Sequence, residues 1–512
     1  MIAQRRHIFR AMFLALTFSA TAAHPQEPAS TPGSGGAASD TLLKRNRASV
    51  LFERNLNTFN WAGSLFVDTA AVGLRLRLEN LLLSNIILVD ATAATPEQRL
   101  QSTQHRLRLR FTRPLTNELS ATGQWSSLSY SDEKAVGLST ASINSVLAGV
   151  EYSPVPLLTL VPMIGHRWDN QIDVRDRGLS YTLFARTSPI DVDGFRLVDS
   201  AQFQQDRLGP RLLEQHYARI GLEKWFLGRT RDSLDAGYVR SRREFYTSQS
   251  GALESRIENI LTFSNLLEYE IDQNLLASVF LSVFGRSLDK DYRPLQPFVR
   301  APAQFNTGIE EFRLETFAQG MYRNDNGVEL TARFAHSERN ERHFAKSRAS
   351  GFLQDTTQAP LTDRQAQEQE QTKDNLTRRT SLVGNIRLPL SMSDTVSLAG
   401  GASILRYDTP SAANVEDRDE LLVALSLSST HQINRYLNVS FLLEGTVNHI
   451  VYLLKDRSAN NNINRVLRFA PSTLFTPFDF LSSMNMFEVL ANYTVYDFEA
   501  QAAQVRSFSY RQ

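Results

Sequence analysis

Short segments in which apolar and polar residues alternate follow one another from about residue 70 to the end of the chain. In residues 72–79 (VGLRLRLE) every second residue is apolar, and the residues between them are mostly charged. The pattern recurs in the segments 106–111, 261–271, 328–334 and 437–448. A period of two is that of a β-strand, whose successive side chains point to opposite faces. The pattern therefore predicts an all-β chain whose strands each have one apolar and one polar face.

The links between these segments alternate in length. Tight turns rich in Pro, Gly, Asn and Asp fall at 112–117, 153–156, 191–194, 228–231, 272–274, 324–327, 391–394 and 432–435. Long links lie near 90–103, 131–141, 169–176, 207–213, 246–255, 289–307, 342–375, 408–418 and 454–483. A transmembrane antiparallel β-barrel sorts its links in this way, with short periplasmic turns and long outer loops. Counting the segments between residues 72 and 498 predicts about eighteen strands, an even number as such barrels require.

The first 23 residues have the three-part organisation of a secretory signal. A basic start (residues 5–10) is followed by an apolar stretch (11–20) and by small residues, with cleavage expected after Ala22 or Ala23. The apolar stretch is too short to cross a bilayer as a helix. We therefore expect residues 1–23 to be a cleaved signal peptide that exports the chain.

Residues 24–69 lie between this signal and the first clear strand. Residues 24–40 are mostly Pro, Gly, Ser and Ala, a composition typical of a flexible linker. Residues 41–69 contain several aromatic residues and could form a short periplasmic segment, a plug-like segment or an extra strand. Residues 70–512 are expected to form one barrel.

Two readings remain open at the C-terminal end. The segment 492–498 (NYTVYDF) has the aromatic pattern of a closing strand, which a short periplasmic tail would then follow. Alternatively, the alternation in 505–510 (VRSFSY) begins a further strand, and the barrel is incomplete at its C-terminus.

Two long links have distinctive compositions. The link at 342–375 is rich in Gln, Asp, Glu and Arg, which predicts a solvated outer loop or a loop folded into the lumen. The link at 454–483 carries many apolar residues together with Pro471 and Pro477. Because so much apolar surface should not stay in water, we expect it to cap the barrel, fold inward or contact a partner.

Residues 72–512 resemble Gram-negative outer-membrane β-barrel proteins as a broad class. The resemblance implies the cell outer membrane of a Gram-negative bacterium as the location, with outer-membrane lipid and the barrel-assembly machinery as partners. It does not extend to one family: the similarity to porins is architectural, and only residues 24–69 are free to form the plug that TonB-dependent transporters carry.

Arginines cluster on the polar side of the first two clear strands. A luminal arginine patch can attract anions, because a guanidinium is always charged and binds carboxylate or phosphate in a fork. Alternatively, these arginines pair with acidic residues and simply fill the wall. The candidate lumen-lining residues are Arg75, Arg77, Arg106, Arg108, Arg110, Glu268 and Glu270.

Other kinds of site have little support in the sequence. The histidines, including His336 and His343 beside the longest link, have no spacing typical of metal ligands or of a catalytic motif. The chain has no cysteine, which excludes disulfides and a cysteine-linked lipid anchor, and its net charge of +1 gives no reason to expect nucleic acid. We therefore expect no enzyme activity, no cofactor and no metal site.

These observations favour a channel or transport pore for polar solutes. The alternative is a structural or assembly barrel of an envelope or export complex, which would bind envelope protein partners through its loops. A third and weaker hypothesis is an outer-membrane hydrolase, which would need a Ser/His/Asp cluster at one rim.

The two faces of the strand at 106–111 generate a first prediction. Leu107→Arg places a charge in hydrocarbon at a cost of roughly 2–4 kcal/mol near the midplane, so folding of this variant should be impaired. Arg108→Ser changes the polar face and should fold normally. Heat-modifiable migration of the purified variants on gels measures folding, and equal folding of both would contradict the lipid-facing assignment.

Overall fold

The structure is a computed structural model that describes residues 46–55, 58–71, 73–89, 98–132, 139–171, 174–247, 252–295, 300–301, 305–350, 353–354, 362–412, 414–478, 481–498 and 504–511. Nearly all of these residues belong to one antiparallel sheet of 24 strand elements. The elements are β1 (Arg47–Asn55), β2 (Thr58–Ala71), β3 (Leu74–Val89), β4 (Gln98–Pro114), β5 (Leu119–Asp132), β6 (Ser139–Val155), β7 (Leu158–Gln171), β8 (Val174–Thr187), β9 (Ile190–Val192), β10 (Phe195–Leu208), β11 (Arg211–Phe226), β12 (Thr230–Thr247), β13 (Ala252–Glu270), β14 (Leu275–Pro294), β16 (Phe305–Arg323), β17 (Glu329–Arg348), β19 (Asn375–Pro389), β20 (Asp394–Asp408), β21 (Arg418–Asn434), β22 (Leu437–Tyr452), β23 (Asn462–Phe478), β24 (Leu481–Met486), β25 (Glu488–Tyr496) and β26 (Gln504–Arg511).

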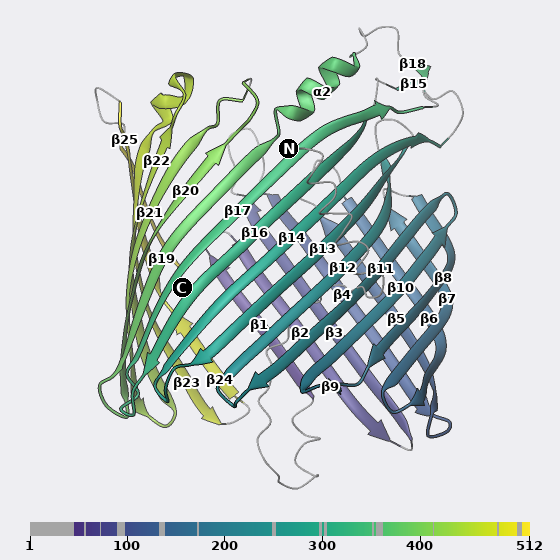
Figure 1. Cartoon of the computed structure of the whole chain (residues 1–512), viewed down its shortest axis with the longest axis horizontal. Coiled ribbons are helices and arrows are strands. Elements are labelled where there is room, and N and C mark those ends of the chain that lie inside the picture. Colours follow the sequence, from purple (N-terminus) through teal and green to yellow (C-terminus); the bar gives the residue numbers. More distant parts are fainter. Residues whose placement is uncertain are drawn as a thin grey trace.

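Neighbours in sequence are neighbours in the sheet, as tight turns between successive strands require. The 24 elements occupy 22 positions across the sheet. Two positions each hold two consecutive elements: β8 and β9 both pair with β10, and β24 and β25 both pair with β23. Figure 1 shows the sheet curled round into a barrel-shaped wall, with the tight turns at one end and the longer links at the other. The predicted all-β antiparallel architecture is therefore confirmed.

The number of strands is larger than the sequence indicated. The sheet begins at Arg47, because β1 and β2 form an antiparallel hairpin that continues directly into the ladder with β3. Of the three alternatives for residues 41–69, the part from Arg47 onward is thus strand, and the boundary at residue 70 is too late. The predicted signal and linker, residues 1–40, lie outside the described residues.

The predicted link at 454–483 also contains a strand. A short 3₁₀ helix, η1 (Lys455–Asn460), comes first, and β23 then pairs with β22 along its length, Leu443 opposite Phe469 and Leu437 opposite Phe475. The apolar residues of this segment therefore belong to the wall instead of forming a cap. With β23 added, β25 runs toward the end of the sheet that carries the long links, and the segment 492–498 ends there. It is therefore not the last strand, because β26 follows and pairs with β25.

Three links that the sequence predicts to be long are short. β7 ends at Gln171 and β8 begins at Val174; likewise β10 ends at Leu208 and β11 begins at Arg211. The third, between β12 and β13, runs from Thr247 to Ala252. Near these links the strands carry polar residues on both faces. The alternation of apolar and polar residues therefore stops before the strand ends, and the sequence pattern places the end of the strand too early.

The link at 342–375 is partly ordered as a helix. Helix α2 (Asp363–Gln371) precedes β19, and a two-residue parallel pairing joins β15 (Arg300–Ala301) to β18 (Leu353–Gln354). Figure 1 places α2, β15 and β18 together at the loop end of the wall. No helix in the described part of the chain is long and apolar enough to cross a membrane.

Within the described residues no ladder joins β1 to β26, so each has one unpaired edge. In hydrocarbon, each unsatisfied backbone N–H or C=O group of an unpaired edge costs several kcal/mol. Because the sheet has an even number of strand positions, its first and last strands run antiparallel to each other. We therefore predict that β26 pairs with β1 in the membrane. A short bifunctional maleimide should join Ser49→Cys to Ser507→Cys or Ser509→Cys, as a reduction-independent shift on denaturing gels.

The absence of native cysteine makes this crosslinking test specific. Ser49→Cys paired with Ser264→Cys on β13 is the control, because β13 lies in the interior of the sheet, between β12 and β14. Failure of both β26 positions to crosslink would mean that the sheet does not close on itself.

Candidate functional site

The β3–β4 ladder divides the predicted residues into two faces. Directly opposed residues of an antiparallel ladder lie on the same side of the sheet. We therefore name an apolar face and a charged face, the first defined by Leu76 opposite Phe111 and Leu78 opposite Leu109, the second by Arg77 opposite Arg110 and Glu79 opposite Arg108.

All seven predicted residues fall on the charged face. Arg75 and Arg106 keep the alternation of β3 and β4, so they join the arginines that define the face. Register carried through successive ladders places Glu268 there as well, opposite Arg231 and Ser278, and Glu270 two residues further along β13. These two acids are far from the arginine cluster, because β13 is separated from β4 by eight strand positions.

The arginines of β3 and β4 have partial carboxylate partners. Arg77 Nε lies 2.9 Å from Glu79 Oε1, and Arg108 Nη1 lies 3.5 Å from the other oxygen of the same carboxylate. Arg75 pairs with Asp68 of β2 at 2.7 Å. In the described part of the chain Arg106 has no ion-pair partner.

Two further pairs extend this cluster along the wall. Arg110 Nη2 lies 3.3 Å from Glu151 Oε2 of β6, and Arg186 of β8 lies 3.7 Å from Oε1 of the same carboxylate. We call the resulting group the arginine patch: six arginines (Arg75, Arg77, Arg106, Arg108, Arg110, Arg186) and three carboxylates (Asp68, Glu79, Glu151). Carboxylates thus pair with five of these arginines, but three carboxylates do not neutralise six arginines. Attraction of anions by this patch stays a prediction.

A second group on the charged face is centred on one buried carboxylate. The Glu311 side chain has no exposed surface, and its two oxygens accept from Arg313 Nε at 2.5 Å, Arg339 Nε at 2.6 Å and Arg286 Nη1 at 3.2 Å. Arg286 also donates to Glu258 at 2.6 Å. A buried carboxylate with three guanidinium donors fixes the positions of β14, β16 and β17 relative to one another.

A third group lies at the loop end of β7, β8 and β11. The Arg211 side chain is completely buried and lies 3.1 Å from the Asp169 carboxylate, which is also buried. Its Nε pairs with Asp176, which in turn accepts a hydrogen bond from the Tyr246 hydroxyl at 2.8 Å. This network holds the short β10–β11 connection against its neighbours.

The sequence predicted neither of these networks. One signal was present: an acid and an arginine two residues apart share a strand face, as do Glu311 and Arg313. The remaining partners are separated by up to 70 residues in the chain, as Tyr246 and Asp176 are, and only the register of the sheet brings them together.

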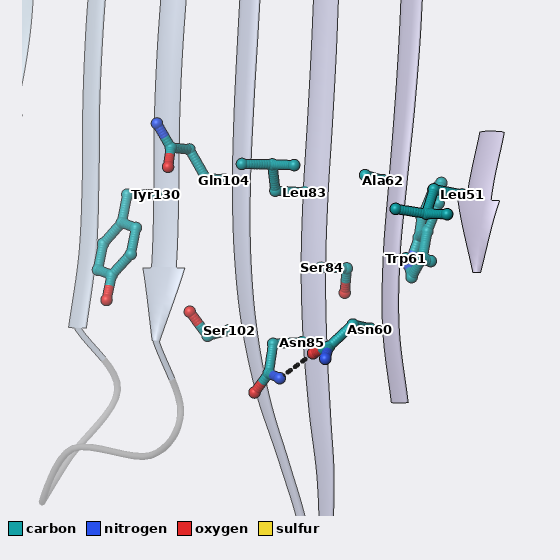
Figure 2. A pocket seen from close by; sticks show the side chains of 10 residues that line it. All are labelled: Leu51, Asn60, Trp61, Ala62, Leu83, Ser84, Asn85, Ser102, Gln104 and Tyr130. Carbon is teal, nitrogen blue, oxygen red and sulfur yellow. Dashed lines mark hydrogen bonds between the residues drawn. The ribbon is translucent and has the colours of Figure 1, made fainter. Parts of the chain in front are cut away.

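An uncharged region adjoins the arginine patch. A cavity of about 290 Å³ is lined by amide, hydroxyl and apolar side chains of β1 to β5. Figure 2 shows Asn60 and Asn85 hydrogen-bonded to each other, with Gln104 and Tyr130 on the strands beyond. Leu83 and Asn85 follow Glu79 in the alternation of β3, and Asn85 lies opposite Ser102 of β4. The cavity is therefore on the charged face. It offers hydrogen-bond donors and acceptors without net charge.

Catalytic or metal-binding groupings do not emerge from the described residues. In this part of the chain no three His, Asp or Glu side chains are grouped so as to hold a metal ion. His336 hydrogen-bonds to the Thr380 hydroxyl at 2.9 Å, and His343 lies near Glu341 and Asp374. Among the described residues His336 has no hydrogen-bonded carboxylate that would orient its ring as in a catalytic triad.

Glu311 allows a test of the buried network. Glu311→Gln would leave three guanidinium groups facing a neutral side chain, and hydrogen bonds to a charged group typically contribute about 1.5–3 kcal/mol. Because Arg313 and Arg339 are 41% exposed and water can solvate them, we expect the free energy of unfolding, measured by urea titration in lipid, to fall by about 1.5–3 kcal/mol.

Glu270→Gln is the matched control for Glu311→Gln. Glu270 is on the same face but exposed, so its substitution should change stability by less than about 0.5 kcal/mol. Similar losses in both variants would show that Glu311 contributes nothing specific.

Comparison with known sequences assigns no family. No family model matches the chain, and no curated protein matches it.

Solved structures that match are outer-membrane proteins. The siderophore receptor PirA from Pseudomonas aeruginosa is 11% identical with a TM-score of 0.33, covering 88% of this chain and 82% of its own. The outer membrane transporter YddB from Escherichia coli is 8% identical with a TM-score of 0.41, covering 89% and 75%. The copper transporter OprC is 10% identical with a TM-score of 0.39, covering 90% and 74%. The structural matches of this chain are thus Gram-negative outer-membrane β-barrel transporters and receptors, without one family by sequence.

Proposed function

We propose that this protein is an outer-membrane channel or transport barrel that moves polar solutes through a lumen lined by its charged face. The observation that carries the proposal is the separation of the two faces. An apolar face on one side of a curved single sheet suits lipid, and an ionic face on the other suits a wet interior.

Contacts across intervening strands support the assignment of the charged face to the lumen. Arg110 on β4 reaches Glu151 on β6, passing over β5, and Arg186 on β8 reaches the same carboxylate over β7. Arg167 on β7 likewise reaches Asp206 on β10 at 2.5 Å, over β8. Side chains of alternate strands converge on the concave side of a curved sheet, so these pairs favour an inward-facing charged face.

The arginine patch suggests a preference for anions. Its arginines are about half exposed, from 41% to 57% for those with carboxylate partners, and exposed pairs of this kind are weak. An anionic solute can therefore compete for them. With six guanidinium groups to three carboxylates, this part of the wall would raise the local concentration of anions.

Ion conductance in a planar bilayer tests the proposal. The wild-type protein should form pores, and the reversal potential in a KCl gradient should indicate a preference for chloride. Combining Arg106→Ser, Arg108→Ser and Arg110→Ser should shift the preference toward potassium, because the patch then has as many carboxylates as arginines and loses its excess positive charge. Arg378→Ser, which removes an arginine from the apolar face, is the control.

Absence of any conductance by correctly folded protein would contradict the transport proposal. That result would favour the alternative function, a structural or assembly barrel that binds envelope partners through its loops. Unchanged selectivity in the triple variant would retain the pore but remove the argument for anions.

A further inference from the structure

The link between β17 and β19 contains a helix whose start is fixed locally. Thr362 caps α2: its hydroxyl accepts a hydrogen bond from Gln365 N at 3.3 Å, and the Gln365 side chain accepts from Thr362 N at 2.9 Å. This reciprocal capping box satisfies amide groups that the first helical turn cannot pair. Helix α2 is therefore a defined element and not an extended loop.

Helix α2 is attached to the free edge of β17. The ladder between β17 and β19 ends at Glu341 opposite Asn375, whereas β17 continues to Arg348. Beyond that point the His343 and Ala345 amides donate to Asp374 Oδ1 at 2.5 Å and Gln367 Oε1 at 3.0 Å. The helix and the residues after it thus replace β19 as the partner of this edge.

A second attachment holds the end of the helix. Asn414, in the link between β20 and β21, donates from Nδ2 to the Thr372 carbonyl at 2.8 Å. Ala366 is only 5% exposed, so one side of the helix is covered. Figure 1 shows α2 at the loop end of the wall beside β17.

Between α2 and the wall lies a cavity of about 400 Å³, large enough for a small organic molecule. Its wall residues are on the charged face, because Ile309 lies opposite His343 in the same alternation that places Glu311 opposite Glu341. Lys290 joins them opposite Thr307. The cavity therefore opens on the same face as the arginine patch.

The cavity lining includes apolar side chains from both the wall and the helix. These are Phe305 and Ile309 of β16 and Ala366 of α2. An apolar lining of this kind favours a solute with a hydrocarbon or aromatic body over a fully hydrated ion.

Lys290 differs from the other basic side chains around the cavity in its ion pairing. Lys373 pairs with Glu370 at 2.6 Å, and His343 lies 3.2 Å from Glu341 and 3.7 Å from Asp374. Lys290, in contrast, has no ion-pair partner among the described residues, and its neighbour in the ladder is another cation, Arg256. A single available ammonium suits a monocarboxylate, whereas a phosphate would call for several donors.

We propose that the cavity between α2 and the charged face binds a small organic monocarboxylate with an apolar or aromatic body. Lys290 pairs with its carboxylate, and Phe305 and Ile309 contact its body. The inference rests on the proposed function, because it names the class of solute that the barrel would collect at the loop end of its lumen.

Calorimetric titration of the full-length protein in nanodiscs with benzoate tests this inference. Benzoate should bind, and benzamide, which has the same shape without the charge, should bind at least tenfold more weakly. Lys290→Gln should lower the benzoate affinity at least tenfold while leaving benzamide unchanged. Lys346→Gln is the matched control, because Lys346 is close in space but pairs with Asp289 outside the cavity.

Folding of each variant is checked by heat-modifiable migration, so that loss of binding is not loss of structure. Absence of benzoate binding, equal binding of benzamide, or unchanged affinity in Lys290→Gln would each overturn the inference. Conductance without benzoate binding would remove the site and keep the channel. Benzoate binding that depends on Lys290 in a barrel without conductance would keep the site and remove the channel.

Discussion

The ladder of backbone hydrogen bonds is the constraint on which the rest of this structure depends. A single curved sheet has no second layer, so each interior strand satisfies its amide groups through its two neighbours. In hydrocarbon the alternative is an unpaired group at a cost of several kcal/mol. The ladders also fix which side chains share a face, since a slip of one residue would exchange the apolar and charged sets.

The charged face follows from this register and has two kinds of region. Around Glu311 three guanidinium groups converge on one buried carboxylate and join β14, β16 and β17. Around Glu79 and Glu151 the arginines outnumber the acids and remain half exposed. The same need to satisfy backbone groups places α2 on the free edge of β17, and the cavity beside Lys290 is a consequence of that attachment.

Much of the fold could be predicted because strand alternation and turn chemistry are local. The tight turns, the direction of β3 and the two faces of β3 and β4 all follow from residues a few positions apart. The strand β23 was missed because Pro471 interrupts its pattern and apolar residues such as Leu474 and Phe475 occupy both faces. The upper parts of β7 to β13 were read as loops because polar residues lie on both faces there.

The sequence by itself determined the class of fold, the ends of most strands at the tight turns and the arginine-rich face, because each depends on neighbours within one strand or turn. Only the tertiary structure decided which charges meet. Arg110 and Glu151 are 41 residues apart, and Glu311 and Arg339 are 28 apart. Their contact depends on the cumulative register of several ladders. For the same reason Lys290 has no ion-pair partner among the described residues, since its neighbours in sequence do not determine which side chains the curved sheet brings beside it.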